Sequence, residues 1–255
     1  MRATILGCGT SSGVPRIGGN WGRCDPRNPK NRRRRVSILV EHREIRLLVD
    51  TSPDLREQLL DAGVRGLDAV LYTHDHADHS HGIDDLRGVY HLMRQRIDCY
   101  MDASTYATLT RRFSYVFEAE GDYPPSAIAR RLGAVHRFGD LVVRPFTQLH
   151  GPVTSTGYRF EAGGAAIAYS TDVSGFPVES EALLEGLDVW IVDALRREPH
   201  PTHSHLEQTL GWIERFRPGL AVLTHMDQSM DYEELMSELP DGVIPGHDGL
   251  VWEIG

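Results

Sequence analysis

Residues 72–87 read YTHDHADHSHGIDDLR, and this stretch decides the fold. Within it lie four potential metal ligands in six residues: His74, His76, Asp78 and His79. The preceding segment, Asp68–Tyr72, is short, apolar and β-prone, whereas the segment from Gly82 onward is typical of the start of a helix. We therefore predict a ligand-bearing loop that leaves a buried strand and leads into a helix.

The spacing of these side chains suits metal binding. In an extended segment, residues i and i+2 point to the same side, so His74 and His76 can contact one ion together. Where the loop turns toward the helix, Asp78 and His79 can face a neighbouring point, so that one loop can serve two ions. Imidazole suits zinc, iron, nickel and copper, and an added carboxylate also admits manganese. The alternative is a histidine-rich surface loop that binds no metal.

The composition is that of an acidic globular protein. The 255 residues are 40% apolar and 25% charged, and they carry a formal net charge of −9. This charge argues against a general nucleic-acid coat, because phosphate binding depends on lysine and arginine. No apolar run approaches the ~20 residues that span a bilayer, and the three widely spaced cysteines form no disulfide framework. We expect a cytoplasmic protein that binds no membrane.

Other polar residues occupy a recurring position, directly after a short apolar segment that is typical of a strand. These residues are His74, His150, Asp172 and His225, and Asp50 follows the same rule. Since strand ends gather at one edge of a sheet, residues far apart in the sequence can converge there. The order of strands, helix and polar loop recurs loosely in both halves of the chain, which favours two sheets packed face to face with helices outside.

The motif at residues 72–87 resembles the signature of the metallo-β-lactamase-fold hydrolases. The resemblance implies an α/β fold, a four-layer αββα sandwich, in a single domain over residues 1–255. It implies two divalent metal ions, zinc or manganese, and a role for Asp50 in orienting the metal-binding loop without contacting the metal itself. The implied ligands are His74, His76 and His150 for one ion, Asp78, His79 and His225 for the other, and Asp172 as the bridge.

Two segments indicate which branch of this family the chain resembles most. The segment Gly7–Pro15, which reads GCGTSSGVP, and residues 73–87 are most similar to the PhnP-type phosphoribosyl cyclic phosphodiesterases. That likeness implies hydrolysis of a small, cyclic phosphodiester by a hydroxide held between the two ions. Aspartate in place of cysteine at position 172 argues against β-lactam cleavage. The PhnP type has several cysteines after Pro15 for an additional zinc, and this chain has only Cys24 there, so we predict no third metal.

Two residues are assigned catalytic roles by the resemblance, Asp78 and His203. His203 precedes a predicted helix at Leu206–Phe216 and matches a histidine that contacts phosphate or donates a proton to the leaving group. His205 stands where the family has a small hydroxyl residue, so it remains the alternative to His203. Helix capping is the other explanation for either histidine.

Other functions stay open at this stage. One is a tRNA 3′-processing ribonuclease, and another is an iron-dependent redox enzyme that uses the same ligands. The arginine run at residues 32–35 can be a solvated surface loop or can contact a phosphorylated substrate. We expect a small phosphodiester substrate and no nucleic-acid partner, and we leave a homodimer open.

Overall fold

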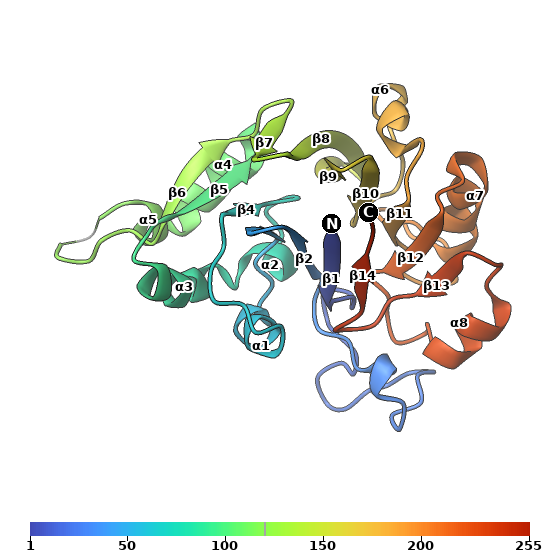
Figure 1. Ribbon diagram of the computed structural model, residues 1–255. Coiled ribbons are helices and arrows are strands. Elements are labelled where there is room, and N and C mark those ends of the chain that lie inside the picture. The colour runs from blue at the N-terminus through green and yellow to red at the C-terminus, as the bar shows by residue number, and fades with distance from the viewer. Residues whose placement is uncertain (120) are drawn as a thin grey trace.

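Two seven-stranded sheets dominate the computed structural model, which describes residues 1–119 and 121–255 (Figure 1). In spatial order, the first sheet contains β14 (Val251–Glu253), β1 (Arg2–Gly7), β2 (Ser37–His42), β3 (Ile45–Val49), β4 (Ala69–Leu71), β5 (Ile97–Met101) and β6 (Ala127–Arg131). The second sheet contains β13 (Val243–Pro245), β12 (Leu220–Thr224), β11 (Val189–Asp193), β10 (Ala165–Ser170), β9 (Val153–Ala162), β8 (Leu141–His150) and β7 (His136–Phe138).

Helices cover the outer faces of both sheets (Figure 1). Those that follow strands of the first sheet are α1 (Leu55–Asp61), α2 (Ala77–Ser80), η2 (Ile83–Asp85), α3 (Leu86–Met93), α4 (Ala103–Arg112) and α5 (Ser114–Phe117). Those that follow strands of the second sheet are α6 (Val178–Glu181), η3 (Ala182–Leu184), α7 (Leu206–Phe216) and α8 (Tyr232–Glu238), and η1 (Pro29–Asn31) lies between β1 and β2. The expected αββα sandwich is confirmed.

The central strands of the first sheet bury both of their faces. In β3, Leu47 and Val49 belong to the apolar core between the two sheets, whereas Leu48 packs beneath the helices. Successive strand residues point to opposite faces, so strands covered on both sides read as continuous apolar runs. Side chains of both sheets share the inner core. The single domain over residues 1–255 stays a prediction.

Parallel pairing determines where the polar strand ends lie. Strands β3, β4, β5 and β6 pair in parallel in the first sheet, and β10, β11, β12 and β13 do so in the second. Parallel strands present their carboxyl ends at the same edge, where ligands bind in open α/β sheets. The residues that follow β3, β4, β10 and β12 therefore meet at that edge. In the described part of the chain, no helix combines the length and apolar character needed to cross a bilayer.

The ligand loop is shorter than the sequence predicted, because α2 begins inside it at Ala77. Its hydrogen bonds explain the difference: His79 N donates to His76 O at 3.1 Å, and Ser80 Oγ donates to the same oxygen at 2.7 Å. Thr51 N also donates to His79 O at 2.8 Å from a neighbouring loop. Two local hydrogen bonds and one from a distant loop thus stabilise a helical turn that the polar sequence pattern does not reveal.

Gly82 provides the first test of this packing. A Cβ at position 82 would press against the Ser52 carbonyl oxygen and lie 2.9 Å from Leu55 Cβ. Since both neighbours are part of the packed interior, Gly82→Ala should lower the free energy of unfolding by about 1–3 kcal/mol. The matched control is Gly88→Ala on α3, where nothing lies within 4 Å of the added methyl. That variant should gain about 0.5–1 kcal/mol in a urea titration, and equal effects would contradict the packing.

Candidate metal centre

The seven side chains expected as metal ligands lie together at the carboxyl edge of the two sheets. His74, His76, Asp78 and His79 follow β4, His150 ends β8, Asp172 follows β10, and His225 follows β12. Three overlapping groups have ligand atoms within 4.8 Å of one another: His74, His76, His150 and Asp172; Asp78, His79 and His225; and Asp172, His203 and His225. The structure therefore brings every one of them into one cluster, and their binding of metal stays a prediction.

The Asp172 carboxylate stands between the two groups of histidines. Its Oδ1 lies 3.0 Å from His79 Nε2 and 3.5 Å from His225 Nε2. Its Oδ2 lies 3.6 Å from His150 Nε2 and 3.8 Å from His74 Nε2. Each oxygen thus faces a different group, which is the arrangement that a carboxylate shared by two cations requires.

Asp50 orients the ligand loop through hydrogen bonds with Thr73 and His79. Its Oδ2 accepts a hydrogen bond from His79 Nδ1 at 2.7 Å and another from Thr73 Oγ1 at 2.8 Å, and its Oδ1 accepts from Thr73 N at 2.8 Å. Because Nδ1 of His79 donates to Asp50, Nε2 is the atom that His79 directs into the cluster. The position after β3 thus holds the orienting carboxylate that the sequence led us to expect.

A variant of Asp50 tests this support. Asp50→Ala should weaken divalent metal binding by about 10- to 100-fold, because His79 would lose the partner that fixes its orientation. Metal affinity is measured by competition with a chromophoric chelator. Asp241→Ala serves as the control, since Asp241 is an exposed aspartate outside the cluster. Unchanged affinity in folded Asp50→Ala protein would remove the orienting role.

Two other histidines, His150 and His203, are also oriented by hydrogen bonds at Nδ1. His150 Nδ1 donates to the Thr202 carbonyl oxygen at 2.8 Å, which leaves His150 Nε2 facing His76 Nδ1 at 3.4 Å. His203 Nδ1 donates to Asp193 Oδ2 at 3.0 Å, and His203 Nε2 lies 3.7 Å from the Asp172 carboxylate. His203 is therefore part of the cluster, with one ring nitrogen anchored and the other directed inward.

His205 has a different position from His203. It is the N-cap residue of α7, and its carbonyl oxygen accepts from Thr209 N at 3.0 Å. Among the described residues, His205 belongs to none of the groups that could hold a metal ion. The geometry favours His203 over His205 as the residue with a functional role.

The chemistry of the donor atoms fits a divalent cation. Nε2 of His74, His79 and His225 is buried and has no hydrogen-bond partner among the described residues. Buried polar atoms are otherwise paired in nearly all cases, because leaving one unpaired costs about 1–3 kcal/mol. Three such nitrogens in two adjacent groups, beside the carboxylates of Asp78 and Asp172, provide the ligand atoms that imidazole and carboxylate offer to a divalent metal ion.

The carboxylates of the cluster stay ionised. Burial opposes the charge on Asp172, but His225 and His79 outweigh it and hold the pKa of Asp172 well below its usual value. Burial, with His79 beside it, lowers the pKa of His74 well below its usual value, so this imidazole is neutral. A charged carboxylate and a neutral imidazole are the forms that bind metal.

The backbone is strained at three positions of the site. Asp50, Asp172 and His225 have φ angles of 63°, 52° and 57°, in the left-handed region. Non-glycine residues rarely adopt this conformation, although aspartate and histidine do so more often than most. Each of the three follows a strand directly or nearly so, and the left-handed turn directs its side chain back toward the sheet edge.

Within the arginine run, Arg33, Arg34 and Arg35 make structural contacts, whereas Arg32 is exposed. Arg33 is buried; its guanidinium donates to the carbonyl oxygens of Asp227 at 3.1 Å and Met230 at 2.5 Å. Arg34 and Arg35 form ion pairs with aspartates of the α1 region. The run thus ties the loop after β1 to the segment after His225, and the surface-loop interpretation is wrong for Arg33.

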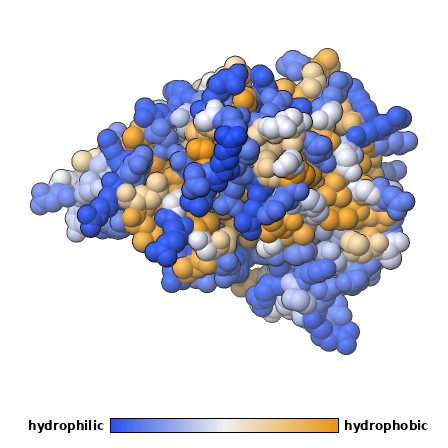
Figure 2. All heavy atoms as spheres, in the orientation of Figure 1, coloured by the Kyte–Doolittle hydropathy of each residue, from blue (hydrophilic) through white to orange (hydrophobic). Residues whose placement is uncertain are grey.

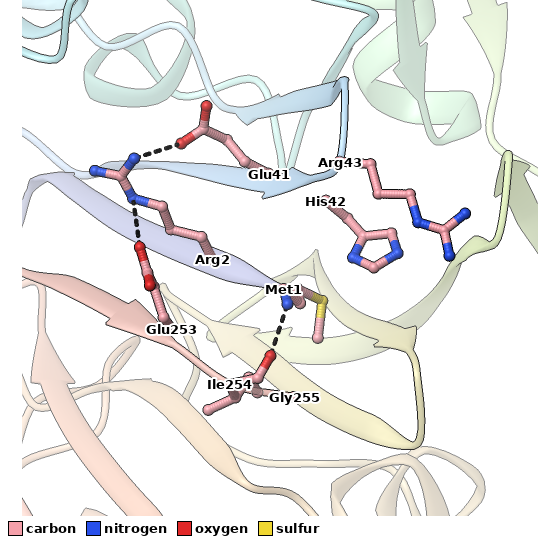
Figure 3. Close-up of a pocket in the computed structure, with 8 residues that line it drawn as sticks. All are labelled: Met1, Arg2, Glu41, His42, Arg43, Glu253, Ile254 and Gly255. Atoms are coloured by element: carbon pink, nitrogen blue, oxygen red, sulfur yellow. Dashed lines mark hydrogen bonds and ion pairs between the residues drawn. The ribbon is translucent and has the colours of Figure 1, made fainter.

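A hollow of about 350 Å³ lies elsewhere, beside β1, β2 and β14 (Figure 3). Arg2 crosses it and pairs with Glu41 at 3.6 Å and with Glu253 at 3.9 Å, as the dashed lines show. Glu41 and Glu253 are thus both paired with Arg2, and the hollow includes no residue of the cluster. The metal centre is therefore the stronger candidate site.

Comparison with known proteins identifies the family. The family model described as the beta-lactamase superfamily domain matches residues 45–226, which include all seven predicted ligands. The chain belongs to this superfamily, and its domain is a hydrolase domain of the metallo-β-lactamase fold. Over its whole length the chain is similar to a diphosphatase of the PhnP family, with 35% identity, a TM-score of 0.90, and coverage of 100% of this chain and 98% of the other. The expected closeness to the PhnP type is confirmed.

Two relatives known by sequence match less of their own length. A protein named octanoyltransferase from Porphyromonas gingivalis (strain ATCC BAA-308 / W83) is 32% identical over 98% of this chain and 51% of its own. Ribonuclease Z of Bradyrhizobium sp. (strain ORS 278) is 28% identical over 52% of this chain and 46% of its own. The chain thus spans about half the length of the curated relatives it matches.

Proposed function

We propose that this protein is a phosphodiesterase that uses two divalent metal ions, zinc or manganese, to hydrolyse a small phosphodiester, most simply a cyclic one. The observation that carries the proposal is the position of Asp172, whose two carboxylate oxygens face two separate groups of histidines at 3.0–3.8 Å. Similarity to a diphosphatase of the PhnP family over the whole chain supports a phosphorus-containing substrate.

The protein would supply the ligands in two sets. One ion would be held by His74, His76 and His150, the other by Asp78, His79 and His225, with Asp172 shared between them. When bound, such ions lower the pKa of water to near 7 and offset the charge that develops on phosphoryl oxygens. His76 is exposed whereas most other members are buried, so substrate would enter on the side of His76.

His203 would manage the proton at the leaving oxygen. The Asp193 carboxylate accepts from His203 Nδ1 and so holds the ring with Nε2 toward the cluster. A histidine fixed in this way can donate a proton from Nε2 to a departing alkoxide, or stabilise its charge. Asp78, with a side chain 12% exposed, faces His79 and His225 and would hold the second ion together with them.

The test combines metal analysis with a substrate panel. The purified protein should contain zinc or manganese and should hydrolyse at least one member of a panel of cyclic and linear phosphodiesters and diphosphates. His76→Ala is the control for activity that depends on the cluster. Metal-loaded protein that is inert toward the whole panel would contradict the proposal.

The same experiment distinguishes the alternatives. A precursor tRNA in the panel tests ribonuclease activity, which the similarity to ribonuclease Z over half of the chain favours and the net charge of −9 opposes. Iron in place of zinc or manganese, together with a coloured protein, would favour a redox enzyme. Either result would replace the phosphodiesterase as the assigned function.

A further inference from the structure

A second cavity lies outside the metal centre, between α3, α5 and the segment before β6. Its volume is about 470 Å³, which is within the range of small-molecule sites. These elements lie together at one end of the molecule, at the left in Figure 1, where hydrophobic residues are interspersed with hydrophilic ones on the surface (Figure 2). Among the residues that line it, none belongs to the groups that could hold a metal ion.

Aromatic rings form much of the wall of this cavity. Tyr90 comes from α3, Tyr115 from α5 and Tyr123 from the segment before β6. Tyr115 is 45% exposed and Tyr123 is 67% exposed, so ring surface remains accessible to a ligand. Planar bases stack on such rings, and each stack contributes appreciably to binding.

Two charged side chains give the cavity a polar edge. The guanidinium of Arg87 lies 5.5 Å from the centre of the Tyr123 ring, and Arg87 Nε is 3.4 Å from His91 Nε2. Asp84, one turn earlier, also lines the cavity; burial, together with the neighbouring Asp84 carboxylate, raises the pKa of Tyr115 to about 12. A guanidinium and a carboxylate thus line the cavity together with the aromatic rings.

We propose that this cavity binds a guanine-type base. Guanine presents ring N–H and amino donors, which a carboxylate accepts, beside O6 and N7 acceptors, which an arginine contacts in a bidentate manner. Asp84 and Arg87 supply these two complements, and the tyrosines supply the stacking surface. Adenine lacks the ring N–H and O6, so it would leave the carboxylate without its partner and bind more weakly.

The site is independent of the proposed hydrolysis, and the experiment keeps the two apart. Guanosine is the probe, since it has no phosphate to contact the metal centre. In calorimetric titrations of the metal-loaded protein, guanosine should bind at least tenfold more tightly than adenosine. The Asp172→Ala variant should retain this binding, so loss of hydrolysis and loss of base binding are separate results.

Variants of the cavity complete the test. Tyr123→Ala should weaken guanosine binding by about tenfold or more, because it removes an exposed stacking ring. Asp84→Asn should reduce the preference for guanosine over adenosine. The control is Leu92→Ala, an exposed α3 residue outside the cavity, which should bind as the unaltered protein does. No guanosine binding at millimolar concentration, equal binding of phenol, or unchanged binding in Tyr123→Ala would overturn the proposal.

Discussion

Replacing Asp172 with alanine should abolish both metal binding and hydrolysis, the largest effect expected for any single change in this protein. This carboxylate faces both sets of histidines, with His79 Nε2 at 3.0 Å on one side and His150 Nε2 at 3.6 Å on the other. Its loss would leave imidazoles facing one another without the negative charge between them, so affinity for divalent metal should fall more than about 100-fold.

The measurement is metal content by elemental analysis, followed by turnover of the best substrate in the panel. Asp172→Asn is the folding control, because asparagine tolerates the left-handed backbone at this position and keeps the shape of the side chain. Asp241→Ala, at an exposed aspartate, controls for loss of surface charge. Full metal content and full turnover in folded Asp172→Ala protein would exclude Asp172 from the site.

Replacing His203 with alanine should slow turnover by about 10²- to 10⁴-fold while the metal content stays unchanged. The expectation follows from its contacts: Nδ1 is bound by Asp193 at 3.0 Å, and Nε2 points toward the cluster without belonging to the inferred ligand sets. A leaving group with a low pKa, such as a nitrophenolate, needs no proton and should largely rescue the variant.

His205→Ala is the matched control for His203→Ala. It removes a histidine two residues away that lies outside the cluster, so turnover should change less than about threefold, as for a surface substitution. Equal losses in the two variants, or loss of metal from His203→Ala, would show that His203 acts through the local fold rather than through proton transfer.

The sequence predicts more of this site than is usual, because its residues follow a simple rule. Asp172 and His225 each come after an apolar strand, and parallel strands bring such positions to one edge. The rule depends only on local pattern, so it holds across about 150 residues of chain. The resemblance then specified which of the polar strand ends to select.

Other features depend on contacts that no local pattern records. Asp193 is the last residue of β11, a position like those of the predicted ligands at other strand ends. No motif in the sequence assigns it a role, and only its hydrogen bond with His203 reveals one. Arg33 looks like part of a charged surface run, but the segment after His225 supplies carbonyl oxygens that allow its burial. The turn that begins at Ala77 likewise gains a hydrogen bond from Thr51, which is distant in sequence.

The cluster draws on both halves of the sandwich. The side chains from His74 to His79 follow a strand of the first sheet, whereas His150, Asp172 and His225 follow strands of the second. A cation held there would act as a clasp, since the halves could not part without releasing it. The free energy of unfolding should then increase with the concentration of free metal ion, by about 2.7 kcal/mol when that concentration is a hundred times the dissociation constant. Removal of the metal with a chelator would weaken the contact between the two sheets and make the protein more sensitive to proteases.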